Sequence, residues 1–405
     1  MASHSPAIQS FTQSTEDKTL SVSWANGDTQ EYPYIWLRDN CQCISVCWHK
    51  SGLAPRAGAR FDLNLDVVPK SVEVTSSNPA SSMDIEWSDG HKSQYLSSWL
   101  SQYRFNKSPE DVILNPKLRY WAADIDEKHQ LKRYDFEEIL TSDEAFLNWI
   151  SDLKELGIAL IVNAPKKEGE LQRLGNRVNF LSRSNFGHIW KVQTRYTASR
   201  EEHNVAYHTG FLPLHTDLST YQSPAGLLLF HCLQAAIEGG ESLLADGFKV
   251  AEDLRRDNPE AFEILTTTVF ENFEKGNATD YHGKYHAVSK HPIIRLDQEG
   301  CIRRIVNSDH TRTPMLRVPV SSVLPVYRAM KLFHGKLHHP DNLFKYKLKE
   351  GDILCVNNYR VLHGRADFKV TEQETTNRHF EGAYLDWDQV NLRMRVLLEE
   401  KATKQ

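Results

Sequence analysis

The chain has 405 residues, 40% of them hydrophobic and 25% charged, which is the balance of an ordinary globular protein. Its 48 Lys and Arg residues and 53 Asp and Glu residues give a formal net charge of −5, so there is no electrostatic basis for binding nucleic acid or an anionic membrane. No apolar run approaches the roughly 18 residues that a membrane-spanning helix needs, which argues against a membrane protein.

The chain start and the cysteines favour a cytosolic protein. The first six residues have neither the apolar core of a secretory leader nor the Arg-rich pattern of a mitochondrial one. Three of the six cysteines lie within residues 41–47 and the others are scattered singly, whereas a secreted disulfide scaffold would be denser and more evenly paired. We therefore expect a cytosolic location.

Short strands dominate the first hundred residues. Several segments alternate apolar with polar side chains and are separated by Gly, Asn, Asp and Ser, namely 19–24, 30–37 and 71–75. Residues 106–135 are polar and show little periodicity. We therefore predict a small β-rich domain over residues 1–105, a linker over 106–135 and a larger domain over 136–405.

The larger domain begins with a helix that Thr141 or Ser142 can cap and that Gly157 ends. Apolar runs of strand length follow at 158–162, 227–233 and 353–356, with a hairpin over 291–306 and a helix near 320–338. Many short strands with few helices, and no Gly-rich phosphate loop, predict a mainly β fold with flanking helices, a jelly roll, rather than a parallel α/β sheet.

A histidine and a carboxylate two residues apart indicate a metal site. His215 and Asp217 would share one face of a strand, because residues i and i+2 point to the same side. The best further ligand is His363, which lies just beyond the run 353–358. Two imidazoles and one carboxylate on one face of an octahedron leave three positions open, the arrangement used for non-haem iron(II).

Arg378 extends this pattern. 2-Oxoglutarate would occupy two of the open positions and dioxygen the third, and the far carboxylate of 2-oxoglutarate needs a planar, permanently charged partner. Arg378, fifteen residues after His363 and expected on the next strand, can form that bidentate pair. The ordered set of His-x-Asp, His-Gly and Arg is much more specific than His-x-Asp alone.

Two other kinds of protein remain alternatives. A jelly-roll binding protein without catalysis would have no reason to keep all four residues. A cupin-like zinc enzyme would leave Arg378 without an assigned partner. Succinate production from 2-oxoglutarate in the presence of iron and ascorbate would separate the three.

The sequence resembles the γ-butyrobetaine hydroxylase and trimethyllysine hydroxylase family, because a series of motifs follows in one order along nearly the whole chain. They are Trp-Leu-Arg-Asp-Asn-Cys at 36–41, Gly-His-Ile-Trp-Lys-Val at 187–192, Asn-Val-Ala-Tyr-His-Thr-Gly at 204–210, His-Thr-Asp at 215–217, Gly-Gly-Glu-Ser-Leu-Leu-Ala-Asp-Gly-Phe at 239–248, Val-Leu-His-Gly-Arg at 361–365 and Glu-Gly-Ala-Tyr-Leu-Asp-Trp-Asp at 381–388. The resemblance implies an iron(II)- and 2-oxoglutarate-dependent dioxygenase of carnitine biosynthesis. Its expected fold is a double-stranded β-helix with a small β-rich N-terminal zinc domain, and its expected assembly is a homodimer.

In this resemblance, His215, Asp217 and His363 match the iron ligands, and Arg378 matches the arginine that binds 2-oxoglutarate. Fe(II), 2-oxoglutarate and dioxygen are therefore the expected cofactor and cosubstrates, with ascorbate as the reductant in assays.

The cysteine cluster near the chain start predicts a structural zinc site. Cys41, Cys43 and Cys47 with the later His91 supply four ligands, enough for a closed tetrahedral ion, and the family places three Cys and a His here. This chain has one extra residue between its second and third cysteines, so His49 is an alternative to Cys47.

The resemblance also implies a pocket for a trimethylammonium group. Such a cation cannot donate a hydrogen bond, so aromatic faces hold it. At the family's cage positions stand Trp190, Tyr207 and Tyr384, and Phe186 takes the place of a tyrosine. Asn204 matches one of the amides that bind the carboxylate of γ-butyrobetaine.

The substrate stays open at this point. The second carboxylate-binding amide of the family would come from residues 306–309, where this chain has Asp309. An aspartate there would repel the carboxylate of γ-butyrobetaine, whereas it could accept a hydrogen bond from the α-ammonium of trimethyllysine. Among candidate substrates, we therefore rank γ-butyrobetaine first, trimethyllysine second and another small molecule third.

Overall fold

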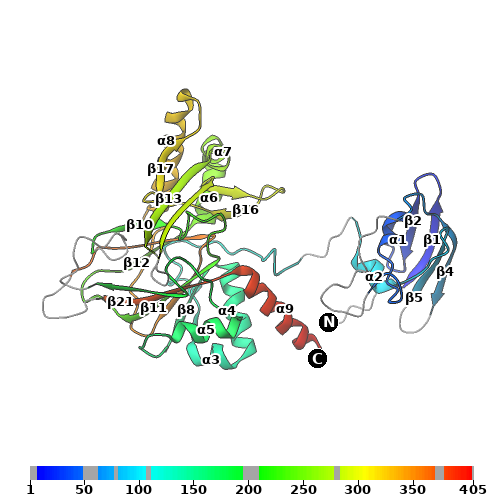
Figure 1. The fold of residues 1–405 in the computed structure, drawn as a ribbon, viewed down its shortest axis with the longest axis horizontal. Coiled ribbons are helices and arrows are strands. Elements are labelled where there is room, and N and C mark those ends of the chain that lie inside the picture. Colours follow the sequence, from blue (N-terminus) through cyan, green and yellow to red (C-terminus); the bar gives the residue numbers. More distant parts are fainter. Residues whose placement is uncertain are drawn as a thin grey trace. The chain divides into compact units, whose positions relative to one another are not determined.

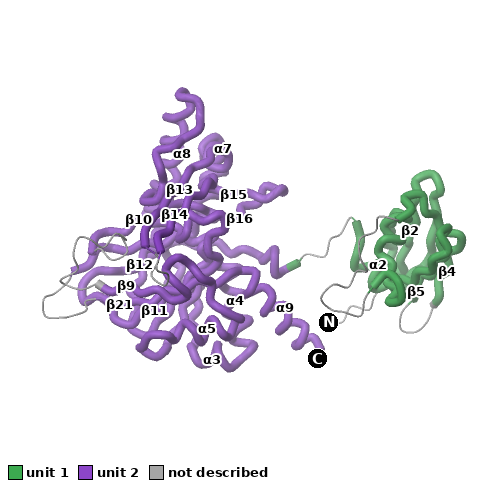
Figure 2. Tube along the Cα trace, in the orientation of Figure 1, with its two compact units in different colours: residues 1–111 green, residues 112–405 purple. Residues whose placement is uncertain are grey.

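The computed structural model describes residues 7–48, 63–76, 81–105, 111–194, 209–277, 283–369 and 378–403. The chain divides into two compact units, Met1–Asp111 and Val112–Gln405 (Figure 2). The second unit thus begins inside the stretch 106–135 that was predicted to be a linker. Trp121, Ile125 and Leu131 from this stretch are buried in its core. They lie outside regular helices and strands, which is why periodicity did not reveal them.

The described part of unit 1 contains two three-stranded antiparallel sheets and two short helices (Figure 1). Its elements are β1 (Ile8–Ser14), β2 (Thr19–Trp24), β3 (Thr29–Pro33), α1 (Tyr34–Asp39), β4 (Pro69–Ser76), β5 (Ser81–Trp87), β6 (Lys92–Leu96) and α2 (Ser97–Gln102). The predicted strand over 30–37 ends at Pro33, which has no N–H for a ladder hydrogen bond. Beyond it α1 buries Tyr34 and Leu37, which are three residues apart and so share one helix face.

Among its described residues, unit 2 has two larger sheets and two smaller ones. Its strands are β7 (Arg133–Asp135), β8 (Ile158–Val162), β9 (Ile189–Thr194), β10 (Leu212–His215), β11 (Leu227–Gln234), β12 (Ser242–Asp246), β13 (Phe270–Asn277), β14 (Lys284–His291), β15 (Ile294–Leu296), β16 (Ile302–Ile305), β17 (Arg312–Leu316), β18 (Phe344–Tyr346), β19 (Ile353–Asn357), β20 (Val361–Arg365) and β21 (Arg378–Leu385). One sheet has the order β7-β8-β19-β11-β21-β9 and the other β10-β20-β12-β18.

Seven helices accompany these strands in the described part of unit 2. They are α3 (Phe136–Thr141), α4 (Asp143–Glu155), α5 (Glu170–Val178), α6 (Gly247–Asp257), α7 (Pro259–Thr267), α8 (Val320–Leu337) and α9 (Trp387–Thr403). Helix α4 begins as predicted, because the Ser142 hydroxyl accepts a hydrogen bond from the Ala145 N–H. Figure 1 shows α3, α4, α5 and α9 near the six-stranded sheet, and α6, α7 and α8 near β13 and β17.

The strand β11 explains how the layers pack. Leu227 and Leu229 belong to the apolar cluster shared with α4, α5 and α9, whereas Leu228 and Cys232 point into the cluster shared with the four-stranded sheet. A strand covered on both faces reads as a continuous apolar run, as this segment does. The predicted mainly β fold with flanking helices is confirmed.

Helices α5, α6, α7 and α9 were not anticipated. The first three have only 9 to 11 residues, which is too short for helical periodicity to stand out. Helix α9 has 17 residues but buries only Val390, Met394 and Leu397. No helix within the described ranges is long and apolar enough to cross a membrane.

Candidate functional site

The three predicted iron ligands come together in unit 2. His215 is the last residue of β10, and His363 lies in the middle of β20. The two strands are antiparallel neighbours, and His215 stands directly opposite His363 in their register. Sheet pairing therefore brings together two histidines that are far apart in the sequence, with their ring centroids 4.4 Å apart.

The ligand atoms face one another across a gap of metal size. Asp217 Oδ1 lies 3.3 Å from His215 Nε2 and 3.4 Å from His363 Nε2. Ligand bonds of about 2.0–2.2 Å at right angles would place neighbouring ligand atoms roughly 3 Å apart. The donor set of two imidazoles and one carboxylate is the one that suits non-haem iron(II).

The ring orientation of His215 also suits metal binding. Its Nδ1 lies 2.8 Å from the carbonyl oxygen of Pro213, which can only accept a hydrogen bond. Nδ1 therefore carries the proton, and Nε2, which faces Asp217, is left with a free lone pair for a metal ion.

Asp217 reaches this position by a route that differs from the sequence prediction. Strand β10 ends at His215, so the alternation of a strand does not place Asp217, and Leu218 next to it has a positive φ of 54°. Instead the Asn358 side chain accepts from the Asp217 N–H at 2.8 Å and donates to the Asp217 carbonyl at 3.0 Å. The hydroxyl of Tyr384 donates to Asp217 Oδ2 at 2.9 Å.

The two histidines shift the pKa of Asp217. Burial alone would raise its pKa, but His363 and His215 outweigh burial and hold the pKa of Asp217 well below its usual range. Burial lowers the pKa of His363. The site thus favours a carboxylate with a neutral His363 imidazole, and these protonation states are the ones that bind a metal.

Arg378 is a buried guanidinium in the same cavity. It opens β21, is only 7% exposed, and lies over the Phe380 ring with 4.0 Å between the guanidinium carbon and the ring centroid. Its Nε and Nη1 find no hydrogen-bond acceptor among the described residues. Burial, followed by the charge of Arg365, lowers the pKa of Arg378 to about 9. A buried cation of this kind requires an anionic partner.

A cavity of about 270 Å³ connects these groups. The predicted site residues on its wall are His215, Asp217, His363, Arg378, Phe186, Trp190 and Tyr384. The rings of Trp190 and Tyr384 lie 5.8 Å apart between centroids. Asn204 and Tyr207 fall outside the described residues, so their positions stay predictions.

Asp309 does not line the cavity, contrary to the sequence prediction. Its carboxylate pairs with Arg312 Nε at 3.1 Å and with His334 Nδ1 at 3.4 Å. The neighbouring residues Ser308 and His310 line the cavity instead. Asp309 faces these two side chains because α8, which carries His334, packs beside it, a contact that no local sequence pattern indicates.

Three residues that support the site were missed. Asn358 orients Asp217, and Glu274 of β13 adds a second carboxylate to the cavity wall. Gly382 lies opposite Trp190, and a Cβ atom added to Gly382 would be 2.2 Å from Trp190 Cζ2. An asparagine directly after a buried strand was a usable signal for Asn358, but nothing local in the sequence singles out Glu274.

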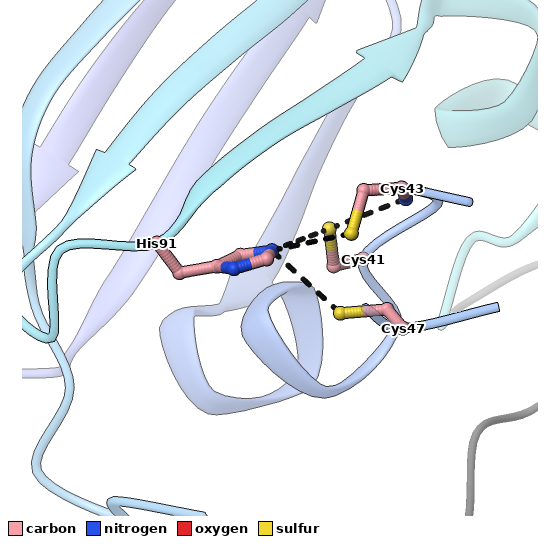
Figure 3. Close-up of side chains that lie close together, drawn as sticks. All are labelled: Cys41, Cys43, Cys47 and His91. Carbon is pink, nitrogen blue, oxygen red and sulfur yellow. Dashed lines mark hydrogen bonds between the residues drawn. The ribbon is translucent and has the colours of Figure 1, made fainter. Parts of the chain in front are cut away.

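The second metal-ligand cluster lies in unit 1 (Figure 3). The sulfur atoms of Cys41, Cys43 and Cys47 lie 3.1, 3.6 and 3.6 Å from His91 Nε2. A tetrahedral zinc ion with Zn–S of about 2.3 Å and Zn–N of about 2.0 Å would separate these atoms by roughly 3.5 Å. Cys47 is therefore part of the cluster, and the alternative residue His49 lies outside the described residues.

The surroundings of Cys43 favour its thiolate form. Burial would raise the pKa of Cys43, but the backbone N–H groups of Val46 and Cys47 outweigh burial and lower it to about 6. Arg38 Nη1 lies 3.9 Å from the Cys47 sulfur, and its Nε pairs with Asp89 at 2.8 Å.

Comparisons with known proteins agree with this geometry. Residues 119–384 match the family described as taurine catabolism dioxygenase TauD, TfdA family, and residues 11–101 match the gamma-butyrobetaine hydroxylase-like N-terminal family. The chain is 35% identical to gamma-butyrobetaine dioxygenase from Homo sapiens over 383 residues, covering 93% of this chain and 94% of that protein.

The chain belongs to the γ-butyrobetaine hydroxylase and trimethyllysine hydroxylase family. The gamma-butyrobetaine dioxygenase of Pongo abelii is also 35% identical, with 94% of each chain covered. The mitochondrial trimethyllysine dioxygenase of Bos taurus is 28% identical, with 97% of this chain and 88% of that protein covered.

As a member of this hydroxylase family, the protein is a 2-oxoglutarate-dependent dioxygenase with a double-stranded β-helix catalytic domain. The resemblance predicted from the sequence motifs is confirmed. The alternative of a binding protein without catalysis is thereby set aside.

Proposed function

We propose that this dioxygenase hydroxylates γ-butyrobetaine, with iron on His215, Asp217 and His363 and with 2-oxoglutarate held by Arg378. The observation that carries the proposal is the pair of buried Arg378 nitrogen atoms with no acceptor among the described residues, in the cavity that holds the three ligands. The distal carboxylate of 2-oxoglutarate would satisfy both nitrogen atoms in a bidentate pair. A zinc enzyme that uses no dicarboxylate would leave this guanidinium buried and unpaired.

The bound iron, with 2-oxoglutarate and dioxygen, would supply the oxidising chemistry, and the chain would supply position and shelter from water. Asn358 and Tyr384 hold the Asp217 carboxylate toward the two histidines through hydrogen bonds. Leu228, Leu354 and Val356 make part of the cavity wall apolar, which keeps bulk water away from the reacting carbon.

The rings in the cavity support a trimethylammonium substrate. Phe186, Trp190 and Tyr384 line the same space as the iron ligands, and ring faces attract a cation that has no hydrogen to donate. Asn204 and Tyr207 are proposed from the motif to complete the binding of the carboxylate and the cation.

Trimethyllysine is the second candidate substrate. The chain is less similar to trimethyllysine dioxygenase than to gamma-butyrobetaine dioxygenase. The argument from sequence that Asp309 could receive an α-ammonium has lost its basis, because that carboxylate pairs with Arg312 and His334. We therefore favour γ-butyrobetaine more strongly than the sequence did.

Zinc, location and assembly are further parts of the proposal. We assign structural zinc to Cys41, Cys43, Cys47 and His91, because four ligands leave no position for a substrate. The cytosolic location and the homodimer stay predictions, which fractionation of cells and light scattering of the purified protein would check.

The direct test is a substrate screen. The purified chain with iron(II), ascorbate and 2-oxoglutarate is offered γ-butyrobetaine, trimethyllysine and related trimethylammonium acids, while succinate and the hydroxylated product are measured. We expect γ-butyrobetaine to stimulate succinate release most and to gain one oxygen atom. If none of these acids stimulates release, the substrate lies outside this class.

A further inference from the structure

A second carboxylate lies in the catalytic cavity beside Asp217. Glu274, on β13, lines the cavity, and the hydroxyl of Tyr285 on β14 donates to its Oε1 at 3.1 Å. Tyr285 stands opposite Gly276, where an added Cβ would be 3.0 Å from both the Tyr285 Cε1 and hydroxyl oxygen. The missing side chain of Gly276 thus lets the Tyr285 ring lie across the strand and reach Glu274.

Glu274 has no cation to balance it among the described residues. No Lys, Arg or His nitrogen of those residues is paired with it, and the Tyr285 hydroxyl is its one hydrogen-bond donor there. Burial, and then the charge of Asp217, raises the pKa of Glu274. An unpaired carboxylate in a partly desolvated cavity is costly, and a ligand with a positive charge would remove this cost.

The neighbouring acid Glu271 shows the contrast. It lies three residues earlier on β13, but it does not line the cavity. Lys290 Nζ lies 3.4 Å from its carboxylate, and the Thr313 hydroxyl donates to it at 3.2 Å. Strand β13 therefore carries one carboxylate outside the cavity that pairs with a lysine, and one inside the cavity that has no paired cation among the described residues.

Glu274 also lies near the aromatic rings of the cavity. The Tyr285 ring that holds it meets the Phe186 ring edge-to-face, with 6.3 Å between centroids and 77° between planes. After burial and Asp217, the charge of Glu274 contributes to the raised pKa of Tyr384, so the two side chains are within electrostatic reach. A cation held by these rings would therefore be close to the Glu274 carboxylate.

We propose that Glu274 is the specificity-determining anion of this pocket. Its carboxylate holds the substrate's quaternary ammonium against the rings, and Tyr285 positions that carboxylate. This inference deepens the proposed function and rests on it for the substrate class. Aromatic faces alone attract a cation only modestly, by about 0.5–2 kcal/mol. A nearby fixed negative charge adds an attraction that a neutral ligand of the same shape cannot receive.

The test compares two probes that share a shape and differ by one charge, choline and 3,3-dimethylbutan-1-ol. Their binding to the full chain, loaded with Mn(II) and 2-oxoglutarate without oxygen, is measured by ligand-observed NMR. Glu274→Gln should weaken choline binding at least about tenfold, which corresponds to about 1.4 kcal/mol, and should leave the neutral probe within roughly twofold. The matched control Glu271→Gln removes the same charge from the same strand and should change neither.

Two further variants keep the inference testable if Glu274→Gln folds poorly. Glu274→Asp retains the charge and should keep most of the preference for choline. Tyr285→Phe removes only the hydroxyl that holds Glu274. It should reduce the preference about two- to fivefold, less than Glu274→Gln, because the carboxylate charge remains, and it should not affect the neutral probe. If Glu274 and Tyr285 only support the fold, these variants should weaken the binding of both probes together.

The inference is overturned if Glu274→Gln weakens both probes equally or neither, or if the wild-type chain binds the two probes equally. Succinate release with γ-butyrobetaine, measured in parallel, tests the proposed function separately. If choline preference depends on Glu274 but γ-butyrobetaine is not turned over, the inference stands and the substrate is another quaternary ammonium compound. If γ-butyrobetaine is turned over while Glu274→Gln keeps the full preference, only the inference fails.

Discussion

The two metal-ligand clusters of this chain differ in how their members are brought together. In unit 1, one short segment carries Cys41, Cys43 and Cys47. The fourth residue, His91, lies in the later loop between β5 and β6. In unit 2, His215 and His363 come from strands that are distant in the sequence and meet only through sheet pairing. The first cluster is therefore visible in the sequence as a local motif, and the second depends on the whole fold.

The clusters also differ in what surrounds them. Four ligands in unit 1 would complete the coordination of a tetrahedral ion, whereas three ligands in unit 2 border a cavity that also contains Arg378 and several rings. A closed site suits a role in folding, and an open site suits chemistry on a substrate. If this contrast holds, damage to the first should affect stability, and damage to the second should affect catalysis.

The largest expected effect is the loss of turnover in Asp217→Ala. Removing this carboxylate leaves two histidines, so succinate release should fall to the background rate. The thermal unfolding of unit 2 should change little, since Asp217 itself belongs to none of its apolar clusters. The control Asp309→Ala removes an acid outside the cavity and should retain turnover. Unchanged succinate release in Asp217→Ala would remove the central assignment.

The next effect is on the stability of unit 1. Cys41→Ser should lower its free energy of unfolding by several kcal/mol, because a structural zinc ion adds its binding energy to folding. Hydrogen exchange measured on the full chain should show faster exchange in β5 and β6 and unaltered exchange in β11 and β19. Cys301→Ser, which changes an exposed thiol outside the cluster, should have no effect. Equal protection in Cys41→Ser and wild type would mean that the cluster does not stabilise the unit.

A smaller effect is expected at the 2-oxoglutarate site. Arg378→Ala leaves the distal carboxylate unpaired, and losing one partner of a buried charge pair costs about 2–5 kcal/mol. The affinity for 2-oxoglutarate should fall more than about tenfold in a calorimetric titration, while substrate affinity changes less. Arg303→Ala, which breaks an exposed pair with Asp297, is the matched control and should leave both affinities unchanged. Wild-type affinity in Arg378→Ala would assign the carboxylate to another basic residue.

The smallest effect sharpens the description of the cavity wall. In Gly382→Ala the new methyl group would overlap the Trp190 ring and displace it from the cavity. Overpacking of this kind costs roughly 1–3 kcal/mol, and substrate affinity should fall with it. Gly335→Ala on α8 has open space around its new methyl group and should stabilise the protein by up to about 1 kcal/mol. Equal behaviour of the two variants in melting and binding assays would refute a positioning role for Gly382.

The sequence by itself determined the features that local patterns carry. The capped start of α4, the apolar runs of β8, β11 and β19, and the cysteine cluster all follow from residues that are neighbours in the chain. The ordered motifs also pointed to the family and to His215, Asp217, His363 and Arg378 before any geometry was known.

The tertiary structure alone decided how those residues are held and which others join them. Sheet register placed His215 opposite His363, and Asn358 rather than strand alternation oriented Asp217. Packing with α8 turned Asp309 away from the cavity, and the β13–β14 hairpin brought Glu274 into it. Such contacts join residues separated by many turns of the chain, and their energies depend on burial and charge in the folded state, which no local spacing encodes.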